Sequence, residues 1–342
     1  MSKSLKELYD EVNIYLKKVN FNNIWNGFKP LKFALYNDKE CYFDGSYIDK
    51  TNLFLGNTAI NYNGQMIAIW NVMEEINPII LTSKMAHEMF HGCQNLNDEK
   101  RFPNEMHAIY NYQYSDRNLS IKLIENKLIN ELNEEFNFDK YQKLLGLRKY
   151  RYNHFKYEFL YESRIEQVEG TANYVELNVL KELSMDLYNK KLSEMKEFII
   201  NEENLLPVRI VSYDIGALLL NILNSNNISF NREFNDITIS EELIKDVKEY
   251  YIDYISLEDE IYNYHLRSKS IIDKALLDDD VIFEGSEKLL AFNVYNARYY
   301  DNYIISRYFV MYGNEDNPLV KYGDFAIKTS IEGIIDKIYN IK

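Results

Sequence analysis

The chain has 342 residues, of which 46% are hydrophobic and 27% charged, so it can bury a sizeable core as an ordinary folded protein. Its formal net charge is −14 and it has no cluster of lysines and arginines, which argues against nucleic-acid binding because phosphate recognition needs a basic surface. It also lacks an apolar signal segment and any apolar run near the roughly 20 residues that span a bilayer, so we expect a cytoplasmic protein without membrane contact.

The first 97 residues predict a helix, a small sheet and a second helix. Apolar residues recur at helical spacing near the N-terminus, at Leu5, Leu8, Val12, Leu16 and Val19. Residues 31–36 are a strand candidate, and Asn63-Gly64 between 58–62 and 65–70 is typical of a two-residue hairpin. We therefore expect an N-terminal helix in residues 1–30 and an antiparallel-sheet subdomain in residues 31–97.

The sequence from Asn77 to about residue 256 is mostly helical in pattern. Asn77-Pro78 predicts a helix start, with an N-cap followed by proline at the first helical position. Further helices are expected over 118–134, 138–149, 155–201 (broken near Leu183-Ser184), 208–224 and 240–256. We expect a helical subdomain in 98–225, a linker at 224–227 and a C-terminal cap in 226–342, with strands or short helices in 288–330. The predicted fold class is α+β, mostly helical.

The segment His87-Glu88-Met89-Phe90-His91 lies inside the helix that starts near Asn77. Two histidines four residues apart share one face of a helix, so both imidazoles can bind one tetrahedral zinc ion. Glu88 would then lie beside the metal without being a ligand, where it can accept a proton from a metal-bound water. The alternative is an amphipathic helix with two exposed histidines, which is improbable in a chain with five histidines.

A catalytic zinc site needs a third protein ligand, and an acidic helix supplies several candidates. At helical spacing, one stripe carries Glu162, Glu166, Glu169, Asn173 and Glu176. Glycine inside a helix lowers its stability, so Gly170 indicates that another backbone approaches closely at this position. The zinc-binding helix is one candidate for this neighbour. Residue spacing alone leaves a solvated acidic face equally plausible.

Taken together, His87-Glu88-x-x-His91 and Glu169-Gly170-x-Ala172-x-Tyr174-x-Glu176 resemble the gluzincin metallopeptidases, most closely the catalytic core of the alanyl aminopeptidase-like family. The resemblance implies a zincin-like helical core and makes Glu169 the third zinc ligand. Asn173 and Glu176 would support the ligands from outside the metal shell. It also maps the family's Tyr-x-x-Gly segment onto Tyr213 to Gly216, which makes Tyr213 the oxyanion-stabilising residue.

The resemblance further implies that an edge strand pairs with an extended substrate, and residues 65–70 are the candidate strand. For the oxyanion-stabilising role, the alternatives to Tyr213 are Arg298, Tyr299 and Tyr300. The expected protein is thus a peptidase with one Zn²⁺ per chain, acting on a peptide or protein substrate with Glu88 as general base. The alternatives are a catalytically inactive, metal-stabilised binding or regulatory protein, and a zinc hydrolase of a non-peptide amide.

Overall fold

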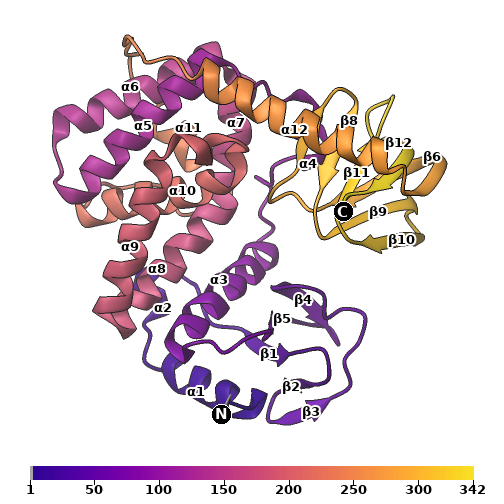
Figure 1. Ribbon diagram of the computed structural model, residues 1–342. Helices are drawn as coiled ribbons and strands as arrows, with labels where there is room; N and C mark the ends of the chain where they lie inside the picture. Colours follow the sequence, from indigo (N-terminus) through magenta and orange to yellow (C-terminus); the bar gives the residue numbers. More distant parts are fainter. Residues whose placement is uncertain (1–2) are drawn as a thin grey trace.

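The computed structural model describes residues 3–342 and shows an α+β protein built from three parts (Figure 1). A small N-terminal sheet with its helices lies at one end, a bundle of helices lies beside it, and a second sheet closes the C-terminal part. The largest hydrophobic core extends from the first helix to Tyr264, so it joins the N-terminal and helical parts. Within the described residues, no helix is long and apolar enough to cross a membrane.

The N-terminal sheet has five strands in the order β3-β2-β1-β5-β4. Their bounds are β1 Lys32–Tyr36, β2 Cys41–Phe43, β3 Ser46–Ile48, β4 Thr58–Tyr62 and β5 Gln65–Asn71. The sheet is mostly antiparallel, as expected, and one pair, β1 and β5, runs parallel. The predicted hairpin is confirmed: β4 pairs with β5 from Tyr62 opposite Gln65, and Asn63 and Gly64 both have the positive φ of a type I′ turn.

Helix α3 (Pro78–Leu96) packs on β4 and β5 and carries the two histidines. The Asn77 side chain accepts hydrogen bonds from the backbone N–H groups of Ile79 and Ile80, as its sequence predicts. Gly92 faces the sheet closely, because a Cβ at this position would lie 2.3 Å from Leu31 Cδ1 and 3.3 Å from Ala59 Cβ. Helix α1 (Leu5–Leu16) packs on α3, and the short helix α2 (Phe21–Ile24) packs on α8 (Thr171–Leu183).

The helical part follows the predicted order closely. Its elements are α4 Glu105–Asn111, α5 Asp116–Glu134, α6 Phe138–His154, α7 Lys156–Ile165, a π-helix η1 Glu166–Gly170, α8 Thr171–Leu183, α9 Met185–Ile200, a 3₁₀ turn η2 Glu202–Leu205 and α10 Val208–Ser225. The break expected near Leu183-Ser184 is present, and Ser184 caps α9. Helix α4 was not predicted.

The predicted helix over residues 240–256 is wrong except for one turn, α11 (Ile239–Leu243). The following segment crosses α6 instead, where the Tyr250 backbone N–H donates to the Gly146 carbonyl. A Cβ on Gly146 would meet Tyr250 at 2.7 Å, so tertiary packing overrides the local helical preference. Ile239, Ile244 and Leu257 are buried in the main core, so the chain leaves the helical part later than the expected boundary at residue 226.

The C-terminal part consists of α12 (Glu258–Asp278), which was not predicted, and a seven-stranded antiparallel sheet. The strands are β6 Val281–Phe292, β7 Arg298–Tyr300, β8 Tyr303–Ser306, β9 Phe309–Asn314, β10 Asn317–Tyr322, β11 Phe325–Lys328 and β12 Ile334–Asn340. The order is β10-β9-β6-β12-β11-β8-β7. Helix α12 packs across β7, β8, β11 and β12, and this sheet has its own hydrophobic core, to which α4 also contributes.

Candidate metal centre

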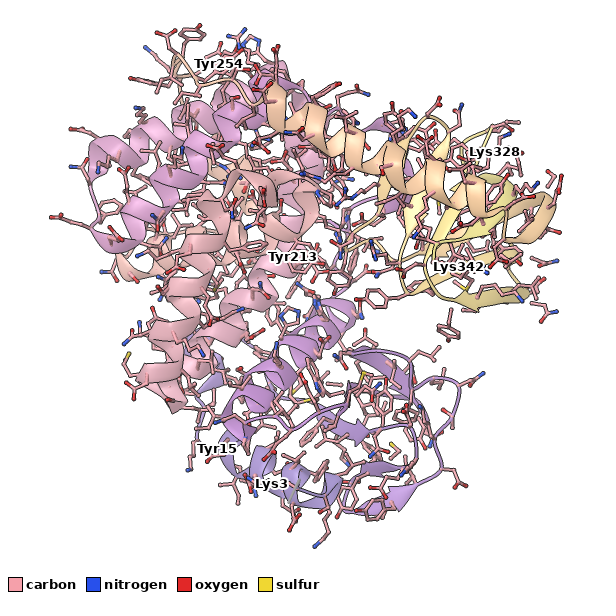
Figure 2. All side chains as sticks on the ribbon, in the orientation of Figure 1. Lys3, Tyr15, Tyr213, Tyr254, Lys328 and Lys342 are labelled. Carbon is pink, nitrogen blue, oxygen red and sulfur yellow. The ribbon has the colours of Figure 1, made fainter. Side chains whose placement is uncertain are left out.

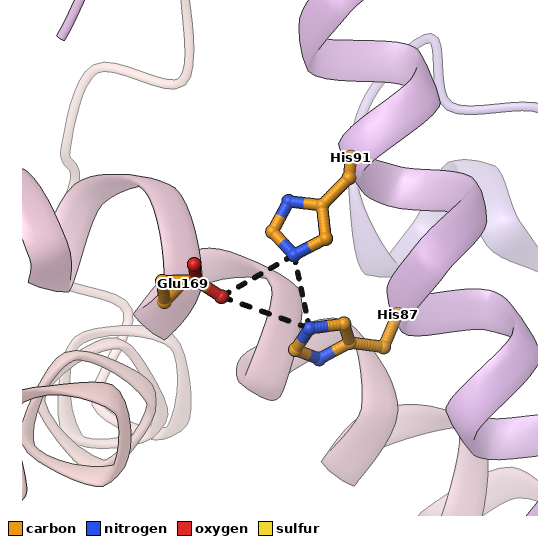
Figure 3. A group of neighbouring side chains, drawn as sticks. All are labelled: His87, His91 and Glu169. Atoms are coloured by element: carbon orange, nitrogen blue, oxygen red, sulfur yellow. Dashed lines mark hydrogen bonds and ion pairs between the residues drawn. The ribbon is translucent and has the colours of Figure 1, made fainter. Parts of the chain in front are cut away.

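Three donor atoms from two distant helices meet at one point (Figure 3). His87 Nε2 lies 3.0 Å from His91 Nε2, and Glu169 Oε2 lies 3.3 Å from His91 Nε2 and 3.9 Å from His87 Nε2. A tetrahedral zinc ion with bonds of about 2.0–2.1 Å needs donors roughly 3.4 Å apart, so the spacing and the donor types fit zinc. Among the residues that the structure describes, this is the one cluster of three or more such side chains that could hold a metal.

Glu169 reaches the histidines because it lies in the π-helix. A π turn adds a residue to the helical repeat and so changes the face on which later residues lie. The expectation that all the acidic residues share one stripe is therefore wrong. Glu162 and Glu166, which precede the change, point into the core and pair with Arg151 and Arg148, whereas Glu169 points to α3.

Gly170 does mark a close backbone approach, but the neighbour is α10 and not the zinc-binding helix. A Cβ on Gly170 would lie 2.7 Å from Gly216 Cα, and a Cβ on Gly216 would lie 2.7 Å from the carbonyl oxygen of Glu166. The two glycines thus permit one helix crossing, in which α10 lies directly against the π-helix. This crossing brings the first turns of α10 to the metal centre.

Gln94, one turn after His91, holds that imidazole in place. Its amide nitrogen donates to the Val168 carbonyl at 2.8 Å and to Thr171 Oγ1 at 3.0 Å, so its oxygen faces His91 Nδ1 at 2.8 Å. The hydrogen on His91 must then be on Nδ1, which leaves the Nε2 lone pair for a metal. The Gln94 amide also ties α3 to the segment that carries Glu169.

The two residues expected outside the metal shell have different positions. Glu176 Oε2 lies 3.6 Å from His87 Nδ1, on the side of the ring opposite the donor nitrogen, so it can orient His87 through its charge. Asn173 instead donates a hydrogen bond to Asp214 Oδ1 at 3.1 Å. It therefore connects α8 to α10, and it makes no hydrogen bond to the three ligands in the described structure.

Arg209, in the first turn of α10, fixes the second oxygen of Glu169. Its guanidinium donates to Glu169 Oε1 at 3.2 Å and also to Glu105 of α4. Because Oε1 is occupied by Arg209, the other oxygen, Oε2, is the one turned toward the histidines. Tyr161 Oη donates to Glu105 at 2.8 Å and completes this chain of hydrogen bonds.

A cavity of about 320 Å³ opens beside the three donor atoms and gives a substrate access to them. It is lined by Asn57, Thr58, His87, Glu88, His91, Gln94, Asn95, Phe102, Pro103, Glu105, Val168, Glu169, Arg209 and Tyr295. Glu88 is 8% exposed, and burial raises the pKa of its carboxyl to about 7. A carboxyl with such a pKa can both accept and return a proton near neutral pH.

The two imidazoles and the Glu169 carboxylate shift each other's pKa values. Burial lowers the pKa of His87, and the charge of His91 lowers it further. Burial also acts to lower the pKa of His91, but the hydrogen bond and charge of Glu169 outweigh it and raise that pKa. Burial opposes ionisation of Glu169, yet its contacts with His91 and the charge of Arg209 hold its pKa at about 2. The site therefore presents a permanent carboxylate to two adjoining imidazoles.

No family model, curated protein or solved structure matches this chain. The resemblance to gluzincins therefore depends on this chain's own residues.

Two tyrosines lie near the metal centre, one from the helical part of the molecule and one from the C-terminal part. Tyr213 lies on α10 at the middle of the molecule (Figure 2), with its ring 5.3 Å from the Arg209 guanidinium carbon. Its hydroxyl is buried, and burial together with the charge of Glu169 raises its pKa well above the usual value. Tyr295, between β6 and β7, has its ring 6.1 Å from that of Tyr213 and lines the cavity itself.

The alternatives to Tyr213 named from the sequence are elsewhere. Arg298, Tyr299 and Tyr300 of β7 line a neighbouring, larger cavity and not the one at the donor atoms. Sequence inspection missed Tyr295 and Arg209. Arg209 could have been found from the sequence, because it precedes Tyr213 by four residues and so lies on the same helix face. Nothing in the sequence distinguishes Tyr295 from the other tyrosines.

The strand expected to pair with a substrate is also corrected. Strand β5 is flanked by β1 and β4, so both of its edges are already paired. Strand β4 is one of the two edge strands of the sheet, the other being β3, and its first residue, Thr58, lines the cavity of the metal centre. An extended peptide in this cavity can therefore add to β4.

Proposed function

We propose that the protein is a zinc-dependent peptidase of the gluzincin type, in which His87, His91 and Glu169 bind one zinc ion and Glu88 is the general base. The observation that carries the proposal is the convergence of two imidazole nitrogens and one carboxylate oxygen, with a buried glutamate beside them, at the floor of an open cavity. A purely structural zinc site has four protein ligands. This site offers three, and it also has a buried glutamate, Glu88, for which a structural site has no use.

The free edge of β4 supports a peptide as the substrate, since its backbone can hydrogen-bond to an extended chain. A zinc ion at this site would polarise the scissile carbonyl and lower the pKa of a bound water toward roughly 7. Glu88 accepts a proton from the attacking water as the oxygen bonds to the carbonyl carbon, and it passes that proton to the amine nitrogen as the C–N bond breaks. Tyr213 or Tyr295 supplies a phenol hydrogen bond to the carbonyl oxygen.

The test combines metal content with turnover on an unbiased substrate. Purified full-length protein is loaded with zinc and freed of excess metal, and its zinc is measured by elemental analysis. It is then incubated with a proteome-derived peptide mixture, and new termini are identified by mass spectrometry. We expect one zinc per chain and cleavage of part of the mixture.

Glu88→Gln is the matched control, because it keeps the shape of the side chain and the three ligands but cannot accept a proton. We expect it to bind zinc as the wild type does and to cleave at least about 10²-fold more slowly. If the wild-type protein does not bind zinc, the proposal is refuted. Zinc binding without cleavage by the wild type would instead favour a metal-stabilised binding protein, and equal cleavage by Glu88→Gln would remove Glu88 as the base.

A further inference from the structure

A second cavity of about 570 Å³ lies next to the metal centre, where α4, α10, α12 and β7 meet. Glu105 and Arg209 line both cavities, so their ion pair is the wall that the two share. The chain from the end of β6 into β7 contributes to both as well, with Tyr295 of the connection in the cavity of the metal centre and Arg298, the first residue of β7, in the second one. Three residues of chain span at most about 10 Å, so the two cavities are close.

Arg298 is the unusual member of the second cavity, which we call the Arg298 cavity. Its guanidinium stacks over the ring of Tyr264 at 4.8 Å, and its Nη1 is buried. Across residues 3–342, no side chain or carbonyl accepts a hydrogen bond from that nitrogen and no carboxylate pairs with the guanidinium. The other arginine of this cavity, Arg209, has two carboxylate partners.

The charged residues that line the Arg298 cavity are Glu105, Arg209, Arg298 and Asp301. Glu105 is already neutralised by Arg209, and Asp301, the other carboxylate, does not pair with Arg298 within residues 3–342. Burial lowers the pKa of Arg298, and the charges of Arg267 and Arg307 lower it further. His265, on α12, adds a buried Nδ1 that has no partner among the described residues. An unpaired guanidinium in a partly enclosed cavity is an arrangement that binds an anion.

We propose that the Arg298 cavity binds a carboxylate of the substrate peptide, within about three residues of the bond that is cleaved. This inference deepens the proposed function and rests on it, since the peptide is the substrate of the metal centre. The carboxylate has two sources, an acidic side chain or the free C-terminus of the peptide, and Arg298 would bind either through its planar pair of N–H donors.

The experiment measures binding without metal or turnover. The full-length chain carrying Glu88→Gln is freed of metal with a chelator and dialysed to equilibrium, at physiological salt, against acetylated hexapeptide pools. One pair of pools differs by Glu against Gln, with amidated C-termini. A second pair lacks acidic residues and differs by a free against an amidated C-terminus. Mass spectrometry gives the retention of each pool.

We expect the charged member of at least one pair to bind roughly 10- to 100-fold more tightly, as a charge-assisted hydrogen bond allows. The pair that responds identifies the source of the carboxylate. Adding Arg298→Gln should abolish the preference. Lys288→Gln is the control, because it removes the same charge from the same sheet, where Lys288 pairs with Glu315 outside the cavity; it should keep the preference.

Three results would overturn the inference: no preference in either pair, a preference that survives Arg298→Gln, or one that Lys288→Gln removes equally. If Arg298→Gln does not fold by circular dichroism, Arg298→Lys replaces it. Lysine keeps the charge but not the planar fork, so the preference should fall several-fold, and an unchanged preference would overturn the inference. Because no zinc is needed, failure here is distinct from failure of the peptidase proposal, which concerns zinc uptake and cleavage.

Discussion

The two carboxylate oxygens of Glu169 have different partners, and these contacts make one oxygen the candidate metal ligand. Oε1 accepts from Arg209, while Oε2 faces the two imidazoles at 3.3 and 3.9 Å. Glu176 lies on the far side of His87, 3.6 Å from the Nδ1 that a metal would not use. The two glutamates thus act at different distances from a bound ion, one directly and one through an imidazole.

This difference is measurable as zinc affinity. Glu176→Ala should weaken zinc binding by about 10–100-fold, the usual effect of removing a residue that orients a ligand. Glu169→Ala should weaken it by well over 100-fold, because a ligand is lost and Arg209 loses one of its two carboxylate partners. Competition with a chromogenic chelator compares the two variants, and the opposite order of effects would make Glu176 the third ligand.

The two phenols at the site can be separated by kinetics. Tyr295 lines the cavity, whereas the hydroxyl of Tyr213 is buried. If a phenol stabilises the developing oxyanion, Tyr295→Phe should lower kcat by about 10²-fold or more while leaving KM nearly unchanged. Tyr213→Phe should have the smaller effect on kcat. A larger loss in Tyr213→Phe would return the oxyanion role to Tyr213, as the resemblance to gluzincins implies.

At the level of elements, the crossing of the π-helix and α10 organises the site. Gly170 and Gly216 face each other with no room for a Cβ on either side. The crossing positions Glu169 on one helix and Arg209 and Tyr213 on the other. Since the π turn selects which acidic residue faces α3, any displacement of this pair changes the geometry of the third ligand.

Gly216→Ala should therefore affect both stability and metal binding. The new methyl group would lie 2.7 Å from the Glu166 carbonyl, and such overpacking costs about 1–3 kcal/mol. We expect a lower free energy of unfolding in urea and, in the folded protein, weaker zinc binding. Ser225→Ala, at the exposed end of the same helix, is the control and should change neither quantity. Normal stability and zinc affinity in Gly216→Ala would mean that the crossing does not position Glu169.

For the molecule as a whole, a buried network of charges stabilises the helical part behind the metal centre. Glu162 accepts hydrogen bonds from Arg151, Lys122 and Tyr112, and the ion-paired side chains of Arg151, Lys122 and Glu162 are at most 1% exposed. Burial opposes the ionisation of Glu162, but the charges of Arg151 and Lys122 outweigh it and lower its pKa from 4.5 to about 2. The network joins α5, α6 and α7.

The lowered pKa predicts how stability depends on pH. Between about pH 4.5 and pH 2 the unfolded chain protonates Glu162 while the folded protein does not, so its contribution is present above pH 4.5 and is lost as the pH falls through this range. Glu162→Gln should lower the free energy of unfolding by about 3–5 kcal/mol at pH 7, because Lys122 and Arg151 both lose a buried carboxylate partner. The difference from wild type should shrink as the pH falls below 4.5.

Urea unfolding of both proteins between neutral pH and about pH 3 measures this difference. Glu131→Gln is the matched control, since Glu131 pairs with Lys140 at the surface, where both side chains are 47% exposed. It should change stability by less than about 1 kcal/mol at any pH. A constant difference between Glu162→Gln and wild type across the range would contradict the lowered pKa.

Features that depend on neighbouring residues could be determined from the sequence. The spacing of His87 and His91 puts both on one helix face, and Asn77-Pro78 starts that helix, because side-chain direction and capping are local. The turn at Asn63-Gly64 and the break at Ser184 follow from local backbone preferences in the same way. Glycine at residue 170 indicated a close approach, although not which backbone approaches.

Features that depend on contacts between distant segments were decided only by the tertiary structure. Regular helical spacing put Glu162, Glu166 and Glu169 on one face, and the π turn, fixed by packing against α10, separated them. Strand β5 has no free edge because β1 pairs with it in parallel, from Lys32 opposite Ile67 to Tyr36 opposite Asn71, so β4 is the edge strand on this side of the sheet. No local pattern encodes a contact between segments so far apart in the sequence. Tyr295 and Arg298 reach the cavities from the last third of the chain for the same reason: burial and long-range pairing, not propensity, set where a side chain finally lies.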